Sequence, residues 1–210
     1  MANTITDRRV ITKIGKNELL QMGVAIEEGE ALALSYIHDI MIFNIPSAHF
    51  FYQNIVNLAI DYTLEEKCKN GIIDYDYHYN YNYSNNCKHI ELVKNDLIIT
   101  HSSGNHRDFP RKAKYREKLC SNQLSLFEEV NTEIMYCILM HSSQLKQGCK
   151  PKIAIGVPDS TCQRWCSYIP LNAISDIVPL NITPVEQKQP DIEKFKFVMK
   201  DRLEELNRIG

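Results

Sequence analysis

The sequence lacks the glycine-rich and serine motifs that mark several large enzyme classes. It contains no Gly-x-x-x-x-Gly-Lys loop for nucleotide phosphates, no dinucleotide-binding glycine pattern and no Gly-x-Ser-x-Gly turn that would present a nucleophilic serine. Long apolar runs are also missing, since the longest candidate, Ile37–Ile45, is interrupted by His38 and Asp39. These absences argue against P-loop nucleotide binding, serine-elbow hydrolysis and a membrane-spanning helix.

A strong excess of charge of one sign is absent too. With 24 basic and 26 acidic residues the formal net charge is −2, so a nucleic-acid contact would need a local basic patch. The seven cysteines are an odd number, and only Cys162 and Cys166 lie one helical turn apart. Because Met1–Ile11 is polar and basic, without the apolar segment of a secretory leader, we expect reduced thiols and a cytoplasmic protein.

Hydrophobic periodicity predicts helices towards both ends of the chain. Apolar residues recur at helical spacing over Lys16–Phe43 and, after a proline, over Ser47–Lys67. A short helix is expected over Cys162–Tyr168, and a closing helix over Pro190–Gly210. The side chains expected to face the core are Leu19, Met22, Ile26, Ala33, Ile37, Phe51, Ile55, Leu58, Tyr62, Phe195 and Met199.

The middle of the chain is predicted to form strands. The segment Asp74–Tyr83 alternates strictly, and we interpret it as a half-buried strand instead of a base-stacking surface, because it carries no Lys or Arg for phosphates. The order of elements predicts one α+β domain over residues 1–210, with a mainly antiparallel sheet of about five strands. The further strands are expected at His89–Val93, Leu97–His101, Glu133–His141 and Lys152–Val157.

A long segment without periodicity, residues 102–132, separates two of the predicted strands. Connections of this length in compact domains are usually functional or disordered. The segment contains Gln123-Leu124-Ser125-Leu126-Phe127, whose residue order looks selected for a partner and not for a core. The alternative is a strand or helical turn that buries the same apolar side chains inside this protein.

The pentapeptide resembles the short motif with which many bacterial replication and repair proteins bind the DNA sliding clamp. That motif has the form Gln-Leu-Ser/Asp-Leu-Phe, and the chain matches it at every position. The resemblance covers five residues, and the rest of the chain resembles no family that we recognise. It implies that Gln123 is the polar anchor, that Leu126 and Phe127 fill an apolar pocket, and that Leu124 is a flanking contact.

Basic residues are concentrated just before this pentapeptide. Pro110 can begin a short helix there, with Tyr115 and Leu119 anchoring one side. Basic side chains on that helix would contact the phosphates of DNA threaded through the clamp without reading its sequence, and a solvated charged helix is the alternative. The residues of this predicted nucleic-acid contact are Arg107, Arg111, Lys112, Lys114, Arg116 and Lys118.

The tripeptide His-Ser-Ser occurs twice, with His101 and His141 at the ends of two predicted strands. If these strands are neighbours, the two imidazoles approach each other, with His106 and Asp108 in the adjoining loop. Two or three imidazoles with a carboxylate suit zinc or another divalent metal, and a histidine alone can act as a general base towards a serine. Neither spacing matches a known metal or triad pattern. Strand carboxylates such as Glu91 are expected to face solvent.

The sequence therefore favours a DNA-associated accessory protein that docks on the sliding clamp and has no assigned catalytic activity. Replication, repair, mobile-element and phage-defence contexts are all compatible with this hypothesis. The first alternative is a metal-dependent nuclease or hydrolase built on the histidine and aspartate residues, with a divalent metal as its cofactor. The second alternative is a structural subunit of a larger protein assembly.

Overall fold

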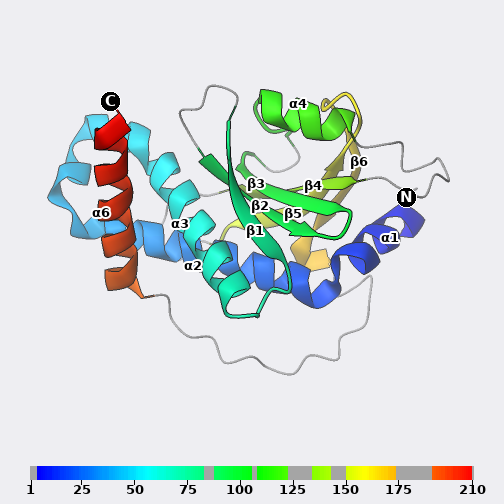
Figure 1. The fold of residues 1–210 in the computed structure, drawn as a ribbon, viewed down its shortest axis with the longest axis horizontal. Coiled ribbons are helices and arrows are strands. Elements are labelled where there is room, and N and C mark those ends of the chain that lie inside the picture. The colour runs from blue at the N-terminus through cyan, green and yellow to red at the C-terminus, as the bar shows by residue number, and fades with distance from the viewer. Residues whose placement is uncertain are drawn as a thin grey trace.

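The computed structural model describes residues 4–82, 88–105, 108–122, 134–142, 150–173 and 191–209, without the side chains of 4–6 and 202–209. Long helices cover one face of a central sheet, and a short helix lies over the other face (Figure 1). This arrangement of N-terminal helices, sheet and C-terminal helix confirms the predicted α+β class. None of the described helices is both long and apolar enough to cross a membrane.

Apolar stripes determine where the helices form, and the residues that interrupt these stripes determine where the helices end. Gly15, with φ at 95°, ends the first helix because this left-handed backbone conformation favours glycine. Two short 3-10 turns, Met41–Asn44 and Pro46–Ala48, join the second helix to the third. The α-helices in the described residues are α1 (Thr4–Ile14), α2 (Lys16–Asp39), α3 (His49–Lys69), α4 (Lys114–Ser121) and α6 (Ile192–Ile209).

In the described part of the chain the sheet has six strands, which follow one another in sequence order. All neighbouring pairs are antiparallel except β3 and β4, which are parallel. A parallel pair needs a long crossover, and α4 lies in that connection on the outer face of the sheet (Figure 1). The strands are β1 (Asp76–Tyr81), β2 (Lys88–Lys94), β3 (Leu97–Ser103), β4 (Met135–Ser142), β5 (Lys152–Pro158) and β6 (Trp165–Pro170).

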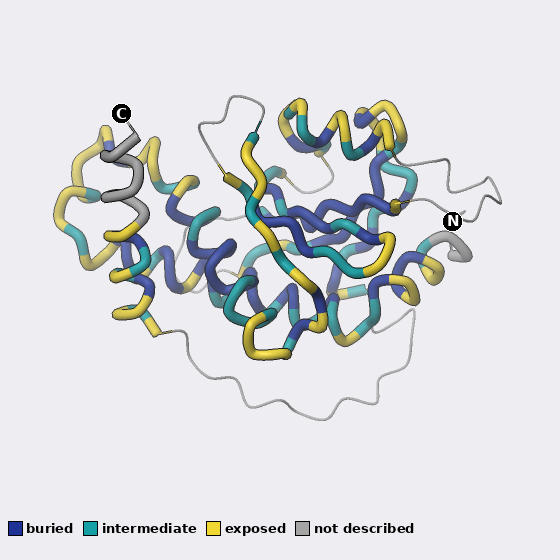
Figure 2. Tube along the Cα trace, viewed as in Figure 1, coloured by how far each residue is buried: buried dark blue, intermediate teal, exposed yellow. Residues whose placement is uncertain are grey.

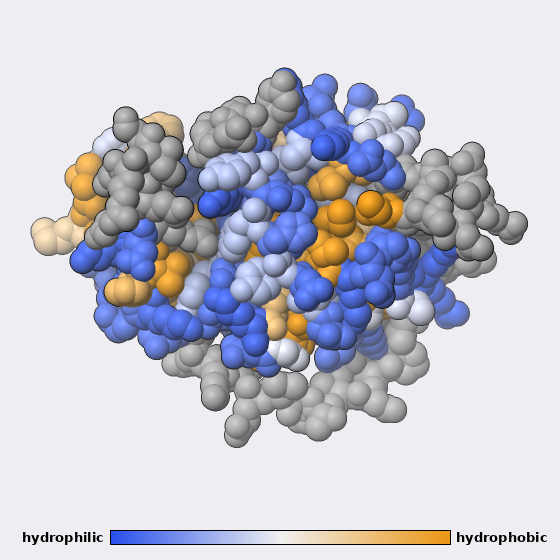
Figure 3. All heavy atoms as spheres, in the orientation of Figure 1, coloured by the Kyte–Doolittle hydropathy of each residue, from blue (hydrophilic) through white to orange (hydrophobic). Residues whose placement is uncertain are grey.

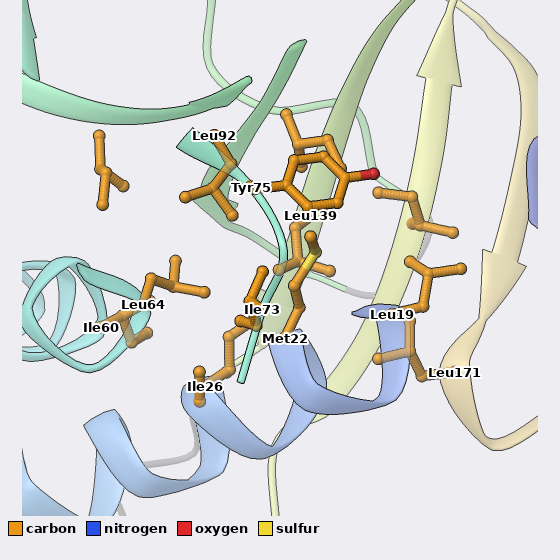
Figure 4. Packing of buried hydrophobic residues seen from close by; sticks show 14 of the residues in the cluster. Leu19, Met22, Ile26, Ile60, Leu64, Ile73, Tyr75, Leu92, Leu139 and Leu171 are labelled. Atoms are coloured by element: carbon orange, nitrogen blue, oxygen red, sulfur yellow. The ribbon is translucent and has the colours of Figure 1, made fainter. Parts of the chain in front are cut away.

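The main core lies between the sheet and the pair α2 and α3. Figure 4 shows Leu19, Met22 and Ile26 of α2 pointing towards Leu92 and Leu139 of the sheet. Strand β4 is dark blue over nearly its whole length in Figure 2, whereas β1 at the edge of the sheet is largely exposed. Most of the predicted inward residues are buried here, because a helical stripe and strand alternation both place apolar side chains on the shared face.

A second, smaller core lies on the outer face, beneath α4. It contains the buried side chains of Cys120 on α4, Tyr136 and Ile138 on β4, and Cys162. Trp165 packs on this cluster and stacks at 4.5 Å between ring centroids against Phe109. The sheet is therefore covered on both faces, and polar residues on its outer face are not automatically exposed to solvent.

The polar N-terminal stretch, for which no element was predicted, forms α1, whose Val10, Ile11 and Ile14 are buried. Two predictions of local structure were wrong. The segment predicted as a short helix is instead a turn ending in β6, because Asp159 accepts hydrogen bonds from the backbone of Gln163 and from nearby groups. The expected helical stripe over Ser47–Lys67 also fails at its start.

A group of apolar side chains is exposed at the start of α3 and in the connection between α2 and α3. Figure 3 shows apolar atoms gathered at this end of the molecule. Phe51, predicted to face the core, is 58% exposed, since the first turn of α3 projects beyond the sheet. The exposed residues of this region are Met41, Ile42, Ile45, Phe50 and Phe51.

Helices α2 and α3 approach each other most closely at Gly29. A Cβ atom on Gly29 would lie 2.8 Å from Cα and 2.9 Å from the backbone nitrogen of Ile60, so no side chain larger than hydrogen fits. We therefore expect Gly29→Ala to lower the free energy of unfolding by about 1–2 kcal/mol, because overpacking against backbone outweighs the gain in helix propensity. Urea unfolding monitored by circular dichroism measures this difference.

Gly23→Ala in the same helix is the matched control for this substitution. Its added Cβ would meet only the terminal Cδ2 atom of Leu171, at 2.6 Å, and a flexible side chain can move where backbone cannot. We expect its stability to stay within about 1 kcal/mol of the wild type. Equal effects of the two substitutions would contradict the close helix contact.

Candidate functional site

The two histidines of the repeated tripeptide come together beneath the sheet. His101 lies near the end of β3 and His141 near the end of β4, and the parallel pairing of these strands puts both ends at one edge. The Nδ1 atom of His101 lies 3.3 Å from the Nε2 atom of His141. Their side chains face the helices, where they are almost completely buried. The predicted approach of the two imidazoles is therefore present.

Two carboxylates from the helices extend this pair at both ends. Asp61 on α3 places Oδ1 2.7 Å from Nε2 of His101. Glu30 on α2 places Oε1 3.7 Å from Nδ1 of His141, which makes no hydrogen bond. Both carboxylates are buried, at 4% and 5% exposed. We name Asp61, His101, His141 and Glu30 the inner polar chain.

Neither carboxylate was identified as a site residue from the sequence, although a signal was present. Glu30 follows Ile26 by four residues, and Asp61 follows Leu58 by three, so each stands on the apolar stripe of its helix. A carboxylate at such a position is rarely left unpaired in a core. A search for acidic residues on predicted buried faces would have found both.

Two contacts of the inner polar chain are short enough for hydrogen bonds, and each joins two atoms with lone pairs, so each needs one proton. The imidazole N–H groups can supply these two protons. The 3.7 Å contact between His141 and Glu30 is an ion-pair distance and no hydrogen bond. Burial and the neighbouring His101 hold the pKa of His141 well below its usual value, so His141 is a neutral member. His101 is oriented by Asp61 and lies within reach of a proton exchange with His141.

A second polar cluster lies on the outer face of the sheet, around Glu91 on β2. Glu91 is buried, which corrects the expectation that it faces solvent, because α4 and the ends of β1 and β2 surround it. Its Oε2 atom accepts a hydrogen bond from Asn80 at 2.8 Å and lies 3.2 Å from Nε2 of His78. Its Oε1 atom lies 2.9 Å from Nε2 of His89. These partners lower the pKa of the Glu91 carboxyl although its burial raises it.

Tyr115 and Arg116 on α4 lie against this outer cluster. The Tyr115 ring stacks on the His89 ring at 3.9 Å between centroids and an interplanar angle of 24°. The guanidinium carbon of Arg116 lies 5.1 Å from the centroid of the Tyr115 ring. Burial raises the pKa of Tyr115, and the charge of Arg116 opposes that rise. The charges of Asp61 and Glu91 raise the pKa of this tyrosine further.

The strand pairing explains where the inner polar chain and the outer cluster lie in the sheet. Residues Leu92–Lys94 of β2 pair with Leu97–Ile99 of β3. Residues 88–91 of β2 pair with β1, and residues 100–103 of β3 pair with β4, but the two segments are not in register with each other. The inner chain and the outer cluster thus lie on the two sides of the region where β2 and β3 separate.

The remaining predicted metal ligands do not join the histidine pair in the described residues. Asp108 is exposed in the loop before α4, and its backbone nitrogen donates to the carbonyl of Asn105. His106 lies outside the described residues. Within the ranges that the structure describes, no group of three His, Cys, Asp or Glu side chains is placed to hold a metal ion. The geometry there fits proton exchange better than metal coordination.

The predicted basic contact divides into exposed and buried residues. Four of its members are exposed before or on α4, whereas Arg116 is buried with its guanidinium turned inward. Arg107 and the clamp-type residues Gln123, Leu124, Leu126 and Phe127 lie outside the described residues, so their predicted roles stay predictions. The four exposed residues are Arg111, Lys112, Lys114 and Lys118.

The buried neutral His141 makes stability depend on pH. In the folded protein its pKa lies well below the usual value, whereas in the unfolded chain it binds a proton near pH 6.5. Below about pH 6.5 the unfolded state therefore carries more protons, and we expect the free energy of unfolding to fall by up to about 1.4 kcal/mol per pH unit from this group. Urea titrations between about pH 5 and 8 measure the slope.

His141→Gln should reduce this slope, because the variant has no imidazole to protonate on unfolding. His38→Gln is the control, since the His38 side chain is 92% exposed and should leave the slope unchanged. The same slope in His141→Gln as in the wild type would refute the assignment of His141 as the buried neutral group.

The chain was compared with family models, curated proteins and solved structures. No family model matches it, and no curated protein or solved structure gives a significant match. The function therefore has to be argued from the residues and their geometry.

Proposed function

We propose that this protein is a DNA-associated accessory protein that docks on the DNA sliding clamp through Gln123–Phe127. The observation that carries the proposal is the complete match of these five residues to the clamp-binding motif. In that motif a polar anchor and an apolar pair supply the hot spot of the interface. Replication, repair, mobile-element maintenance and phage defence are the processes in which such docking is used.

The position of the pentapeptide in the fold supports this proposal. It follows directly on the exposed end of α4, where Ser121 and Asn122 are both exposed. The helix itself lies on the outer face of the sheet, away from the main core (Figure 1). A recognition peptide is best presented from such a place, because its apolar anchors must reach another protein without unfolding the domain.

Exposed positive charge beside the peptide supports a role near DNA. Arg111, Lys112, Lys114 and Lys118 are exposed within the twelve residues before Gln123. A clamp encircles duplex DNA, so a bound protein with basic side chains at this place can contact the phosphate backbone. Such contacts add affinity without sequence preference, which suits an accessory protein that travels with the clamp.

The decisive test is binding of a purified bacterial sliding clamp. We expect the double substitution Leu126→Ala and Phe127→Ala to weaken clamp binding at least about tenfold, because it removes the apolar pair that fills the pocket. Surface plasmon resonance against immobilised clamp measures the affinity, and circular dichroism checks the fold. The matched control replaces Glu128 and Glu129, which follow the motif, by alanine. Undiminished binding by the Leu126 and Phe127 variant would remove the proposal.

The second candidate function is a nuclease or hydrolase that uses His101 as a general base. The observation that favours it is the contact of His101 with both Asp61 and His141, at 2.7 and 3.3 Å. A carboxylate that orients an imidazole is a recurrent arrangement in acid–base catalysis. The metal-dependent form of this candidate depends on His106, which lies outside the described residues.

Cleavage assays separate this candidate from clamp docking. We expect any cleavage of single- or double-stranded DNA to fall at least about a hundredfold in His101→Ala, because general-base catalysis typically contributes that much. His38→Ala, at an exposed site, should retain full activity. Metal analysis of the purified protein and assays with magnesium, manganese and zinc test the metal-dependent form. Activity that survives in His101→Ala would exclude the catalytic role.

A further inference from the structure

Arg116 carries a buried positive charge that no carboxylate neutralises within the described part of the chain. Its side chain is 8% exposed, and none of the ion pairs among the described residues includes it. The Nη1 atom donates to the carbonyl oxygen of Arg111 at 2.6 Å, and Nη2 donates to Oγ of Ser102 at 2.9 Å. Its Nε atom is buried without a hydrogen-bond partner.

A cation in this position is unfavourable unless an anion compensates it. Buried charges in proteins are normally paired, because transfer from water costs several kcal/mol for each unpaired ion. The two neutral acceptors fix the orientation of the guanidinium but leave its charge uncompensated. The two hydrogen bonds use two of the five N–H donors of the guanidinium, and the Nε–H among the remaining three is buried without a partner. The fold thus holds Arg116 in a fixed position with donors to spare, which is the arrangement expected of a binding residue.

His89 presents a second nitrogen without a partner next to the same tyrosine. Its Nε2 atom faces Glu91, whereas its Nδ1 atom is buried and makes no hydrogen bond. The ring of Tyr115 stacks on His89 and also carries the guanidinium of Arg116 at 5.1 Å. With Nε2 directed at Glu91, the Nδ1 atom of His89 points away from the carboxylate. Two buried nitrogens without partners, one on α4 and one on β2, therefore adjoin one aromatic ring.

A phosphate monoester is the anion that these two nitrogens suit best. A guanidinium matches the spacing of phosphate oxygens, and the Nδ1 atom of an imidazole can form a hydrogen bond with a phosphate monoester, which carries both acceptor oxygens and a hydroxyl. The exposed Lys112, Lys114 and Lys118 raise the local concentration of polyanions around α4. Because Arg116 is more than nine-tenths buried, a continuous strand that leaves on both sides of each phosphate does not fit. A phosphate at the end of a chain needs only one exit.

We propose that Arg116 and His89 bind a phosphate monoester, supplied by the end of a nucleic-acid strand or by a mononucleotide. If the phosphate belongs to the end of a strand, the proposal rests on the proposed association with DNA. The strand end is then the part of the nucleic acid that Arg116 and His89 hold. Tyr115 adjoins both residues. His78, whose side chain is 50% exposed, marks the solvent side of the outer cluster.

The probes are inorganic phosphate, AMP, and a single-stranded oligonucleotide with either a 5′-phosphate or a 5′-hydroxyl end. Isothermal titration calorimetry at constant ionic strength measures affinity. We expect the 5′-phosphorylated oligonucleotide to bind at least about tenfold more tightly than its 5′-hydroxyl form, since a charge-assisted pair is lost without the phosphate. Tight binding of AMP with equal affinities for the two oligonucleotides assigns the site to a mononucleotide.

Arg116→Gln and His89→Gln should each reduce phosphate-monoester affinity at least about tenfold. Lys118→Gln is the matched control on the same helix, and its exposed charge should change affinity less than about threefold. If the first two variants do not fold, the wild-type protein still decides the question. The Nε–Hε resonance of Arg116, identified by its absence in Arg116→Lys, should then shift on addition of phosphate.

No preference for phosphate over chloride and no shift of this resonance would overturn the inference. So would full affinity in folded Arg116→Gln. Clamp binding is measured separately and depends on Leu126 and Phe127, so either proposal can fail while the other stands.

Discussion

The close packing of α2 on α3 at Gly29 and Ile60 is the contact on which the interior of this protein depends. Thr63 reinforces it by donating a hydrogen bond of 2.7 Å to the carbonyl of Ala25. The next residue on each helix, Glu30 and Asp61, is thereby held under the sheet and directed at the histidine pair. A small residue at the helix contact therefore decides where two buried carboxylates lie, and the inner polar chain follows from helix packing.

Buried charge is compensated differently in the inner polar chain, around Glu91 and around Arg116. In the inner chain the two carboxylates face imidazoles, which can share a proton with them. Glu91 is held by two histidines and an amide, which compensate its burial. The partners of Arg116 among the described residues are neutral acceptors and the Tyr115 ring. This contrast makes Arg116 the residue whose environment is least complete without a further molecule.

Local pattern predicts much of this fold but little of its polar interior. The stripes around Met22 and Ile55 and the apolar run of β4 identify helices and strands because burial on one face imposes a period. The approach of the histidines could also be predicted, since both end a strand. The contacts to Asp61 and Glu30 span forty residues or more, and the burial of Glu91 depends on a helix from the crossover. Such pairings are set by topology, which periodicity does not encode.

Helix α4 joins the proposed partner contact to the proposed phosphate contact. It has eight residues, and isolated helices of that length are unstable in water, so its stability comes from tertiary contacts. Cys120 and Arg116 supply those contacts from its buried side. Compensation of the Arg116 charge by a bound phosphate would strengthen the same side, and the pentapeptide begins two residues after the helix ends. If both proposals hold, binding at the two places would be coupled through the stability of one short helix, because either ligand would favour the folded state of α4.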